Sequence, residues 1–127
     1  MHRSRLAGLI LDCKDADLGA ATHFWAKALG MPDAGPDSDG YRYLDATARD
    51  LQIEVQGVKH ESRVHIDIES DDVDAEVERL ERLGARRVEK IKTWWVLQAP
   101  TGQRFCVVRA KTDLGSAAGA NVWNRER

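Results

Sequence analysis

The sequence predicts an α+β domain in which one small βαβββ module occurs twice. Residues 63–69 alternate strictly between apolar and polar side chains, which is typical of a strand with two different faces. Two amphipathic segments have helical spacing, and both end in Leu-Gly, at Leu29-Gly30 and Leu83-Gly84. Each of these segments follows a predicted strand and precedes paired strands, so the chain repeats itself. A module of this size cannot bury both faces of its sheet alone, so we expect two copies to pair.

Length and composition indicate a single globular domain. The chain has 127 residues, of which 43% are apolar and 31% are charged, and its net charge is −2. A chain of this length can bury a core without covalent staples. Charges of both signs are interspersed, so we expect no nucleic-acid partner. No apolar run approaches the roughly 20 residues of a membrane-spanning helix, so we expect no membrane partner.

The cysteine content and the N-terminus favour a cytoplasmic location. Cys13 and Cys106 each lie inside an apolar run. The apolar run from Leu6 to Leu11 is too short for the core of a signal peptide, and Asp12 interrupts it. Two thiols in such a chain are typical of a reduced intracellular protein.

We predict the first module over about residues 5–57. Its expected elements are a strand at 6–13, a helix at 17–29, a loop at 31–40, and strands at 41–46 and 51–56. Asp15 or Asp17 is expected to cap the helix, and Gly30 to end it. In the last strand, Ile53 and Val55 should face a core, whereas Glu54 should face the other side.

We predict the second module over about residues 63–110, followed by a C-terminal tail at 111–127. Its expected elements are a strand at 63–69, a helix at 72–83 capped by Asp71 or Asp72, and strands at 86–91, 93–98 and 104–109. In the first strand, Val64, Ile66 and Ile68 should face the core. His65, Asp67 and Glu69 should point the other way, and we expect Glu69 to be solvated at the strand end. The tail is either mobile or packs late through Val122 and Trp123.

His65 and Glu54 are the two candidate catalytic residues. The alternation of its strand turns His65 to the face opposite the core, and its near-neutral pKa suits proton transfer. It would act as a metal ligand, a general base or a hydrogen-bond anchor, unless it only bonds a neighbour such as Asp67 or a residue on an adjacent strand. Glu54 in an apolar cleft could have a raised pKa and act as a base.

Further side chains are predicted to line the cleft and to contact a small-molecule ligand. An aromatic wall with a few fixed polar groups is typical of such a site. Of two adjacent tryptophans on a strand, one should line the cleft and the other pack under a helix. Cys106 is either a nucleophile assisted by Arg104 or a small apolar strand residue. The predicted ligand-binding residues are Gln52, Tyr41, Tyr43, Asp67, Trp95, Arg104 and Cys106.

Several motifs resemble the vicinal oxygen chelate superfamily, which includes glyoxalases, bleomycin-resistance proteins and extradiol dioxygenases. Within it, the chain is most similar to short glyoxalase-like domain proteins. The matching stretches cover most of residues 6–109. They are Asp15-Ala16-Asp17-Leu18 with Phe24-Trp25 and Leu29-Gly30, Arg63-Val64-His65-Ile66-Asp67-Ile68 with Asp72-Val73-Asp74-Ala75-Glu76, Leu80 with Leu83-Gly84-Ala85, and Trp95-Val96-Leu97 with Ala99-Pro100, Gly102 and Arg104-Phe105-Cys106-Val107-Val108.

The resemblance implies that the two modules form a curved, U-shaped mixed sheet around a cleft, whose concave side holds a divalent metal. Family ligands come from the first and last strands of each module. At the corresponding positions, this chain has Gly8, His65, Cys106 and a position near Gln52 or Glu54. A tight metal site normally needs three or more protein ligands of suitable type. We therefore expect no complete metal site; if a divalent metal does bind, His65 and Glu54 would hold it.

Two functions follow from the resemblance. In the first, the protein binds a small organic molecule in the cleft without a metal. In the second, it is a metal-dependent lyase, isomerase or dioxygenase. Family members often complete their clefts across a dimer interface, and a sheet with exposed edges has a physical reason to pair, so we also expect a homodimer.

Overall fold

The computed structural model describes residues 1–15, 17–36 and 40–124. Ala16 of the first family motif, residues 37–39 of the predicted loop and residues 125–127 of the tail lie outside the described residues. The chain forms two compact units, which we name after their helices. The α1 unit is Gly8–His65, and the α2 unit is Met1–Ala7 together with Ile66–Arg127. Strands β1 (His2–Lys14) and β5 (Arg63–Ser70) contribute residues to both units.

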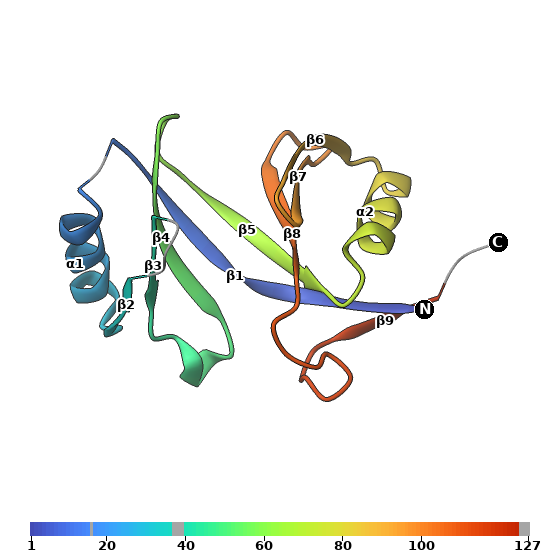
Figure 1. The fold of residues 1–127 in the computed structure, drawn as a ribbon, viewed down its shortest axis with the longest axis horizontal. Coiled ribbons are helices and arrows are strands. Elements are labelled where there is room, and N and C mark those ends of the chain that lie inside the picture. The colour runs from blue at the N-terminus through green and yellow to red at the C-terminus, as the bar shows by residue number, and fades with distance from the viewer. Residues whose placement is uncertain (16, 37–39, 125–127) are drawn as a thin grey trace. The chain divides into compact units, whose positions relative to one another are not determined.

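The α1 unit pairs four strands beneath one helix. Its further elements are α1 (Leu18–Leu29), β2 (Asp33–Pro36), β3 (Tyr41–Leu44), a 3-10 turn (Thr47–Arg49) and β4 (Gln52–Val58). The strand order is β2-β3-β4-β1, with β4 parallel to β1 and β3 antiparallel to β4. Helix α1 packs against β3 and β4 (Figure 1).

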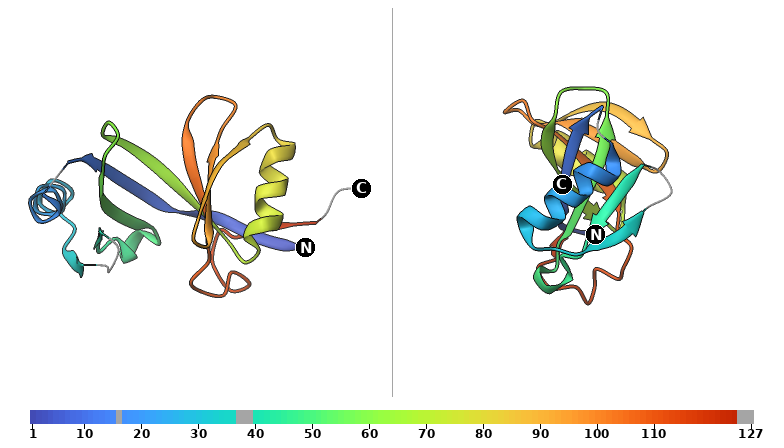
Figure 2. Two further views of the ribbon diagram at one scale, coloured as in Figure 1. Left: turned by 45° about the horizontal axis from the view of Figure 1, so that its top comes forward. Right: turned by 90° about the vertical axis from the view of Figure 1, so that its left-hand side faces the viewer.

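The α2 unit repeats this plan and adds one strand. Its further elements are α2 (Val73–Arg82), β6 (Arg86–Ile91), β7 (Trp94–Gln98), β8 (Arg104–Arg109) and β9 (Asn121–Trp123). The strand order is β5-β8-β7-β6, and β9 pairs antiparallel with the start of β1. Helix α2 packs against β6, β7 and β8, and Figure 2 shows β9 beside the N-terminal end of β1.

Each unit has its own apolar core between its helix and one face of its strands. In the α1 unit, Leu44, Ile53 and Val55 are buried, and Trp25 of the helix packs against them. This arrangement confirms the predicted inward direction of Ile53 and Val55. The core of the α2 unit is formed by Val77, Leu80, Ala85, Leu97, Phe105 and Val107, with Ile68 packed against it.

The helix ends resolve the alternatives that the sequence leaves open. Asp17 caps α1 by accepting a hydrogen bond from the Ala20 N–H, and Asp72 caps α2 by accepting one from the Ala75 N–H. Gly30 ends α1 with a φ of 66°, a left-handed conformation that glycine adopts without steric cost.

Two predictions about the strands are wrong. Residues 33–36, which were expected in a loop, form β2 against β3. Val64 and Ile66 were expected in the core, but they are 58% and 41% exposed. Helix α2 lies over β6, β7 and β8 rather than over β5, so the apolar face of β5 is covered only where Ile68 meets the core.

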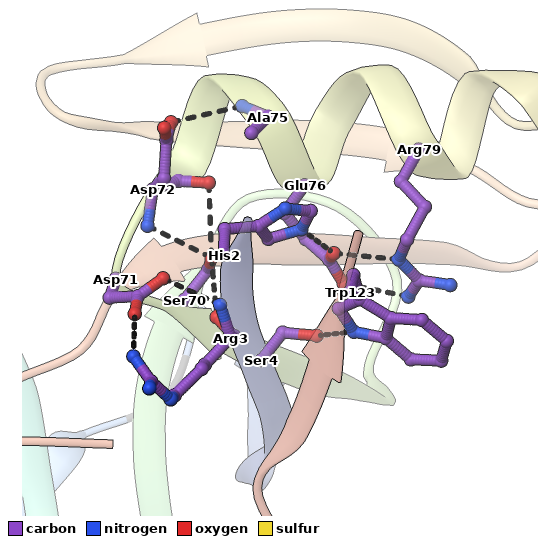
Figure 3. Close-up of polar contacts among 10 residues, drawn as sticks. All are labelled: His2, Arg3, Ser4, Ser70, Asp71, Asp72, Ala75, Glu76, Arg79 and Trp123. Carbon is purple, nitrogen blue, oxygen red and sulfur yellow. Dashed lines mark hydrogen bonds and ion pairs between the residues drawn. The ribbon is translucent and has the colours of Figure 1, made fainter. Parts of the chain in front are cut away.

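A buried polar cluster ties α2 to both ends of the chain (Figure 3). Glu76 is fully buried, and its carboxylate bonds the Nε2 of His2 and the guanidinium of Arg79 at 2.8 Å. The Arg79 guanidinium stacks on the Trp123 ring, 3.8 Å from its centre. The Trp123 indole N–H donates to the Ser4 hydroxyl at 2.9 Å. Trp123 is therefore packed, which is one of the two outcomes that the sequence left open for the tail.

The Glu76 carboxyl group stays ionised in this cluster. Burial alone would raise the pKa of Glu76, but hydrogen bonds from Arg79, His2 and Ser4 outweigh it and hold the pKa below its ordinary value. Its stabilising contribution is therefore complete above the pKa of an unfolded glutamate, about 4.3. It declines as the pH falls below that value and is lost below the folded-state pKa.

We predict that Glu76→Gln lowers the free energy of unfolding at pH 7 by about 1.5–3 kcal/mol, because charge-assisted hydrogen bonds are lost. The deficit should shrink as the pH falls through the acid range, and urea denaturation between pH 3 and pH 7 measures both effects. Glu78→Gln is the matched control, because Glu78 is exposed on the same helix. Equal effects of the two substitutions would contradict the buried-carboxylate account.

Candidate functional site

The face of the α1 unit that points away from its helix carries most of the predicted site residues. The register pairs Tyr43 with Glu54 and Tyr41 with Gln56 across β3 and β4. It also pairs Gly8 with Gln52, Ile10 with Glu54 and Asp12 with Gln56 across β1 and β4. Paired residues lie on the same side of a sheet. The polar face of the α1 unit is therefore made of Gly8, Ile10, Asp12, Tyr41, Tyr43, Gln52, Glu54 and Gln56.

His65 is held beside this face by Asp12. Its Nδ1 lies 2.7 Å from the Oδ2 of Asp12. The side chain of Asp12 is only 2% exposed and that of His65 is 14% exposed. A carboxylate at Nδ1 favours the tautomer in which Nδ1 carries the proton and the lone pair is on Nε2. The polar face thus carries an oriented imidazole.

Two further side chains, a guanidinium and an imidazole, approach the same Asp12 oxygen. The Arg63 Nε lies 3.8 Å from Oδ2, and the His60 Nε2 lies 4.0 Å from it. The other oxygen, Oδ1, is buried and has no hydrogen-bond partner in the described part of the chain. Asp12 therefore faces one guanidinium and two imidazoles on one side and offers a hydrogen-bond acceptor on the other.

Glu54 and the two tyrosines complete this face. Glu54 is buried, whereas Tyr41, Tyr43 and Gln52 are half-buried. The structure thus places Glu54, Gln52, Tyr41 and Tyr43 on one surface, as their alternation predicts. Strand β1 lies between Glu54 on β4 and His65 on β5 in the strand order.

Three predicted residues of the second module, Asp67, Arg104 and Cys106, lie on one face of the α2 unit. Asp67 pairs with Cys106 across β5 and β8, and Arg104 lies two residues before Cys106 on β8. Glu69 follows Asp67 on this face and is buried rather than solvated, which corrects the prediction. The Arg5 Nε donates to Glu69 at 2.8 Å, and this ion pair accounts for the burial of the carboxylate. We call Asp67, Glu69 and Cys106 the acidic face of the α2 unit.

Trp95 does not lie on the acidic face, which corrects its predicted role. It pairs with Val107, whose side chain is fully buried in the core under α2, and its own ring packs against that core. The Arg87 guanidinium covers the Trp95 ring at 4.9 Å from its centre. Because side chains alternate along a strand, Trp94 takes the opposite face. The sequence alone does not show which of the two adjacent tryptophans packs under the helix.

Gly8 cannot carry a ligand without a change in the backbone. A Cβ atom at this position would collide with the main-chain carbonyl of Gln52 on β4. The polar face then offers one imidazole and the carboxylates of Asp12 and Glu54, and Asp12 is already bonded to His65 and lies near the Arg63 guanidinium. A cation competes poorly with such neighbours, so these residues do not match a complete metal-binding set.

The thiol of Cys13 plays no part in the polar face. Cys13 packs against the core of the α1 unit. Burial, and then the negative charge of Asp12, raise the pKa of the Cys13 thiol above its ordinary value. A protonated thiol in such surroundings is a poor nucleophile.

Sequence reasoning missed Asp12 as a site residue. The signal was present, because Asp12 is a charged residue inside an otherwise apolar strand. A charged side chain in such a strand is almost never buried without a partner. The partner itself, His65, lies on a strand far along the chain and could not be named without the strand order.

The comparisons with known proteins agree with this architecture. The family model for the glyoxalase-like domain matches residues 8–108. The chain belongs to the glyoxalase-like domain family. A comparison with curated protein sequences finds no match.

Solved structures show that this glyoxalase-like chain has the α+β fold of the glyoxalase/bleomycin resistance superfamily. Methylmalonyl-CoA epimerase from Mycobacterium tuberculosis matches with a TM-score of 0.61 and 19% identity, over 88% of this chain and 91% of that chain. A glyoxalase/bleomycin resistance protein/dioxygenase superfamily member from Vibrio splendidus matches with a TM-score of 0.54 and 18% identity, over 82% and 97%. The Mn(II)-bound glyoxalase from Novosphingobium aromaticivorans matches with a TM-score of 0.60 and 19% identity, over 86% of this chain and 40% of that chain.

We predict that Asp12→Ala changes the tautomer of neutral His65. In the unsubstituted chain, the carboxylate should hold the proton on Nδ1, and its removal should increase the share of the Nε2-protonated form. The ¹⁵N chemical shifts of the His65 ring at a pH where it is neutral measure this ratio. Asp15→Ala is the control, since Asp15 is exposed and lies 3.6 Å from Lys59 rather than near His65. An unchanged ratio in Asp12→Ala would mean that Asp12 does not orient the ring.

Proposed function

We propose that the glyoxalase-like chain binds a small organic molecule on the polar face of the α1 unit, without a complete metal site. His65 and Glu54 are the residues that would contact its polar groups. Tyr41, Tyr43 and Gln52 would contact the rest of the molecule. That Asp67, Arg104 and Cys106 contact a ligand stays a prediction from the sequence.

The observation that carries the proposal is the bond between the His65 Nδ1 and the buried Asp12 carboxylate. A histidine with a buried partner is fixed in direction, so little side-chain entropy is lost when it contacts a ligand. Small-molecule sites combine a few oriented polar groups with aromatic surface, and the two tyrosines supply that surface.

A metal-dependent lyase, isomerase or dioxygenase is the alternative function. Its support is the presence of an imidazole and two carboxylates, of Glu54 and Asp12, on one polar face. The absence of a side chain at Gly8 and the Arg63 guanidinium near Asp12 count against it. In this alternative, His65 and Glu54 hold the divalent metal.

We predict that ligand contacts map to the polar face. In ¹⁵N-labelled protein mixed with pools of small metabolites, a binding compound should shift the resonances of Tyr43, Glu54 and His65. Both His65→Ala and Tyr43→Leu should weaken its binding about tenfold or more, which corresponds to about 1.4 kcal/mol. His23→Ala is the control, because His23 is exposed on α1. Shifts confined to other surfaces would refute the proposed site.

Elemental analysis of protein purified without chelator separates the two functions. We expect less than one divalent metal per chain, and the same content in His65→Ala. One stoichiometric metal that is lost in His65→Ala would establish the alternative instead. A substoichiometric metal that survives this substitution would be adventitious and would leave the metal-free proposal in place.

The proposal also includes a homodimer in the cytoplasm. None of the described helices is long and apolar enough to cross a bilayer.

Leu6 and Ile66 are 47% and 41% exposed on β1 and β5 of the α2 unit, and a second chain would cover such apolar side chains. Sedimentation equilibrium should therefore give a dimer for the unsubstituted chain and a weaker one for Ile66→Lys. A monomer at all concentrations would remove this part of the proposal.

A further inference from the structure

Arg63 is a charged residue beside the polar face to which the proposed function gives no contact with the ligand. It lies on β5 two residues before His65, so alternation puts both side chains on the same face of the strand. Its Nε lies 3.8 Å from the Oδ2 of Asp12, which agrees with this direction. The Arg63 side chain is 46% exposed, whereas that of Asp12 is 2% exposed. The guanidinium is therefore the solvent-accessible member of this charge pair.

His60 fixes the direction of the Arg63 guanidinium. The His60 Nδ1 lies 2.8 Å from the carbonyl oxygen of Glu61, and a carbonyl only accepts, so Nδ1 carries the proton. In the neutral ring, Nε2 then has a lone pair, and the Arg63 Nη2 donates to it at 3.3 Å. The guanidinium is thus held from two sides, by His60 through a hydrogen bond and by Asp12 through charge.

These two contacts leave most of the guanidinium available. The distance of 3.8 Å to Asp12 is too long for a hydrogen bond. Among the described residues, the hydrogen-bond acceptor of Arg63 is the His60 Nε2. The nearby Lys14 differs, because its ammonium group donates to the Glu61 carboxylate at 2.6 Å. Arg63 is therefore a positioned cation whose remaining N–H groups can bind a further acceptor.

The shape and charge of this group select a carboxylate. A guanidinium is planar and binds a carboxylate through two parallel N–H···O bonds. One guanidinium next to the buried Asp12 offers a single positive charge. A singly charged carboxylate is balanced by it, whereas the second charge of a phosphate would be repelled by Asp12.

We propose that Arg63 recognises an anionic group of the ligand, and that the ligand is an organic acid whose carboxylate lies beside His65. This inference rests on the proposed function, because it names the class of small molecule that the polar face binds. Asp12 pairs with Gln56, and Gln56 pairs with Tyr41, so these residues form one row across the strands. The rest of the acid would extend from Arg63 along this row to the Tyr41 ring.

Two probes that differ in charge test the proposal. We predict that 3-phenylpropionate binds about tenfold more tightly than its neutral amide, 3-phenylpropanamide, because the acid alone accepts charge-assisted hydrogen bonds from the guanidinium. Titration of ¹⁵N-labelled protein measures both dissociation constants. The Arg63 Nε–H and the Tyr41 amide are the resonances to follow.

Substitutions separate the guanidinium from the other charges nearby. Arg63→Gln should abolish the preference for the acid, whereas Arg63→Lys keeps the charge without the planar fork and should restore part of it. Lys14→Gln is the matched control, because Lys14 is also a half-exposed cation but is held by Glu61, and it should leave the preference unchanged. Circular dichroism should show the same secondary structure in all variants.

The outcomes distinguish this inference from the proposed function. Equal binding of the acid and the amide, with shifts at Tyr41 and His65, would overturn the inference and leave the proposed function in place. Acid-dependent shifts confined to Arg63 and His60, with none at Tyr41 or Glu54, would refute the proposed site but support Arg63 as a carboxylate-binding residue. A lack of binding by either probe, or a preference that persists in Arg63→Gln, would also overturn the inference.

Discussion

Buried carboxylates that must be neutralised constrain this structure more than any other feature. An ionised carboxylate loses its hydration on burial and has to be compensated by cations or hydrogen-bond donors. Asp12 is compensated by His65, Glu69 by Arg5, and Glu76 by His2 and Arg79. Three of the side chains involved come from β1, whose polar residues therefore specify the fold as much as its apolar ones.

In both units, the two faces of the strands have different roles. Each helix covers one face of its strands and forms an apolar core there, as Val55 and Val107 show. The other face points away from the helix and carries polar side chains. In the α1 unit this face carries Glu54 and Asp12, so chemistry and core formation use alternate residues of the same strands. This separation allows one fold to carry different activities in different relatives.

Local sequence patterns were sufficient to predict most of the secondary structure. They were not sufficient to predict which part of each sheet face a helix covers. Alternation correctly separated His65 and Asp67 from Ile66 and Ile68. It could not show that α2 stops short of Ile66, since coverage depends on where a helix lies across the sheet. The short strands β2 and β9 were missed or left open for a related reason. A strand of three or four residues exists only because its partner is present.

The candidate site was predictable in its members but not in its internal bonds. Glu54, Tyr41 and Tyr43 follow from period-two spacing on strands that the sequence marks clearly. The bond from His65 to Asp12 depends on which strands are neighbours, and that is a property of topology. The role predicted for Trp95 was wrong because the sequence does not show which of two adjacent tryptophans faces the core.

The crowding at Gly8 limits how this chain could change. Any side chain introduced there meets the backbone of β4 at Gln52, so a histidine or glutamate would be admitted only if the strands moved apart. A donor atom at that position is thus more than one substitution away. A complete set of metal ligands in this protein therefore requires β1 and β4 to move apart first. Most single substitutions in that direction would weaken the sheet before they supplied a ligand.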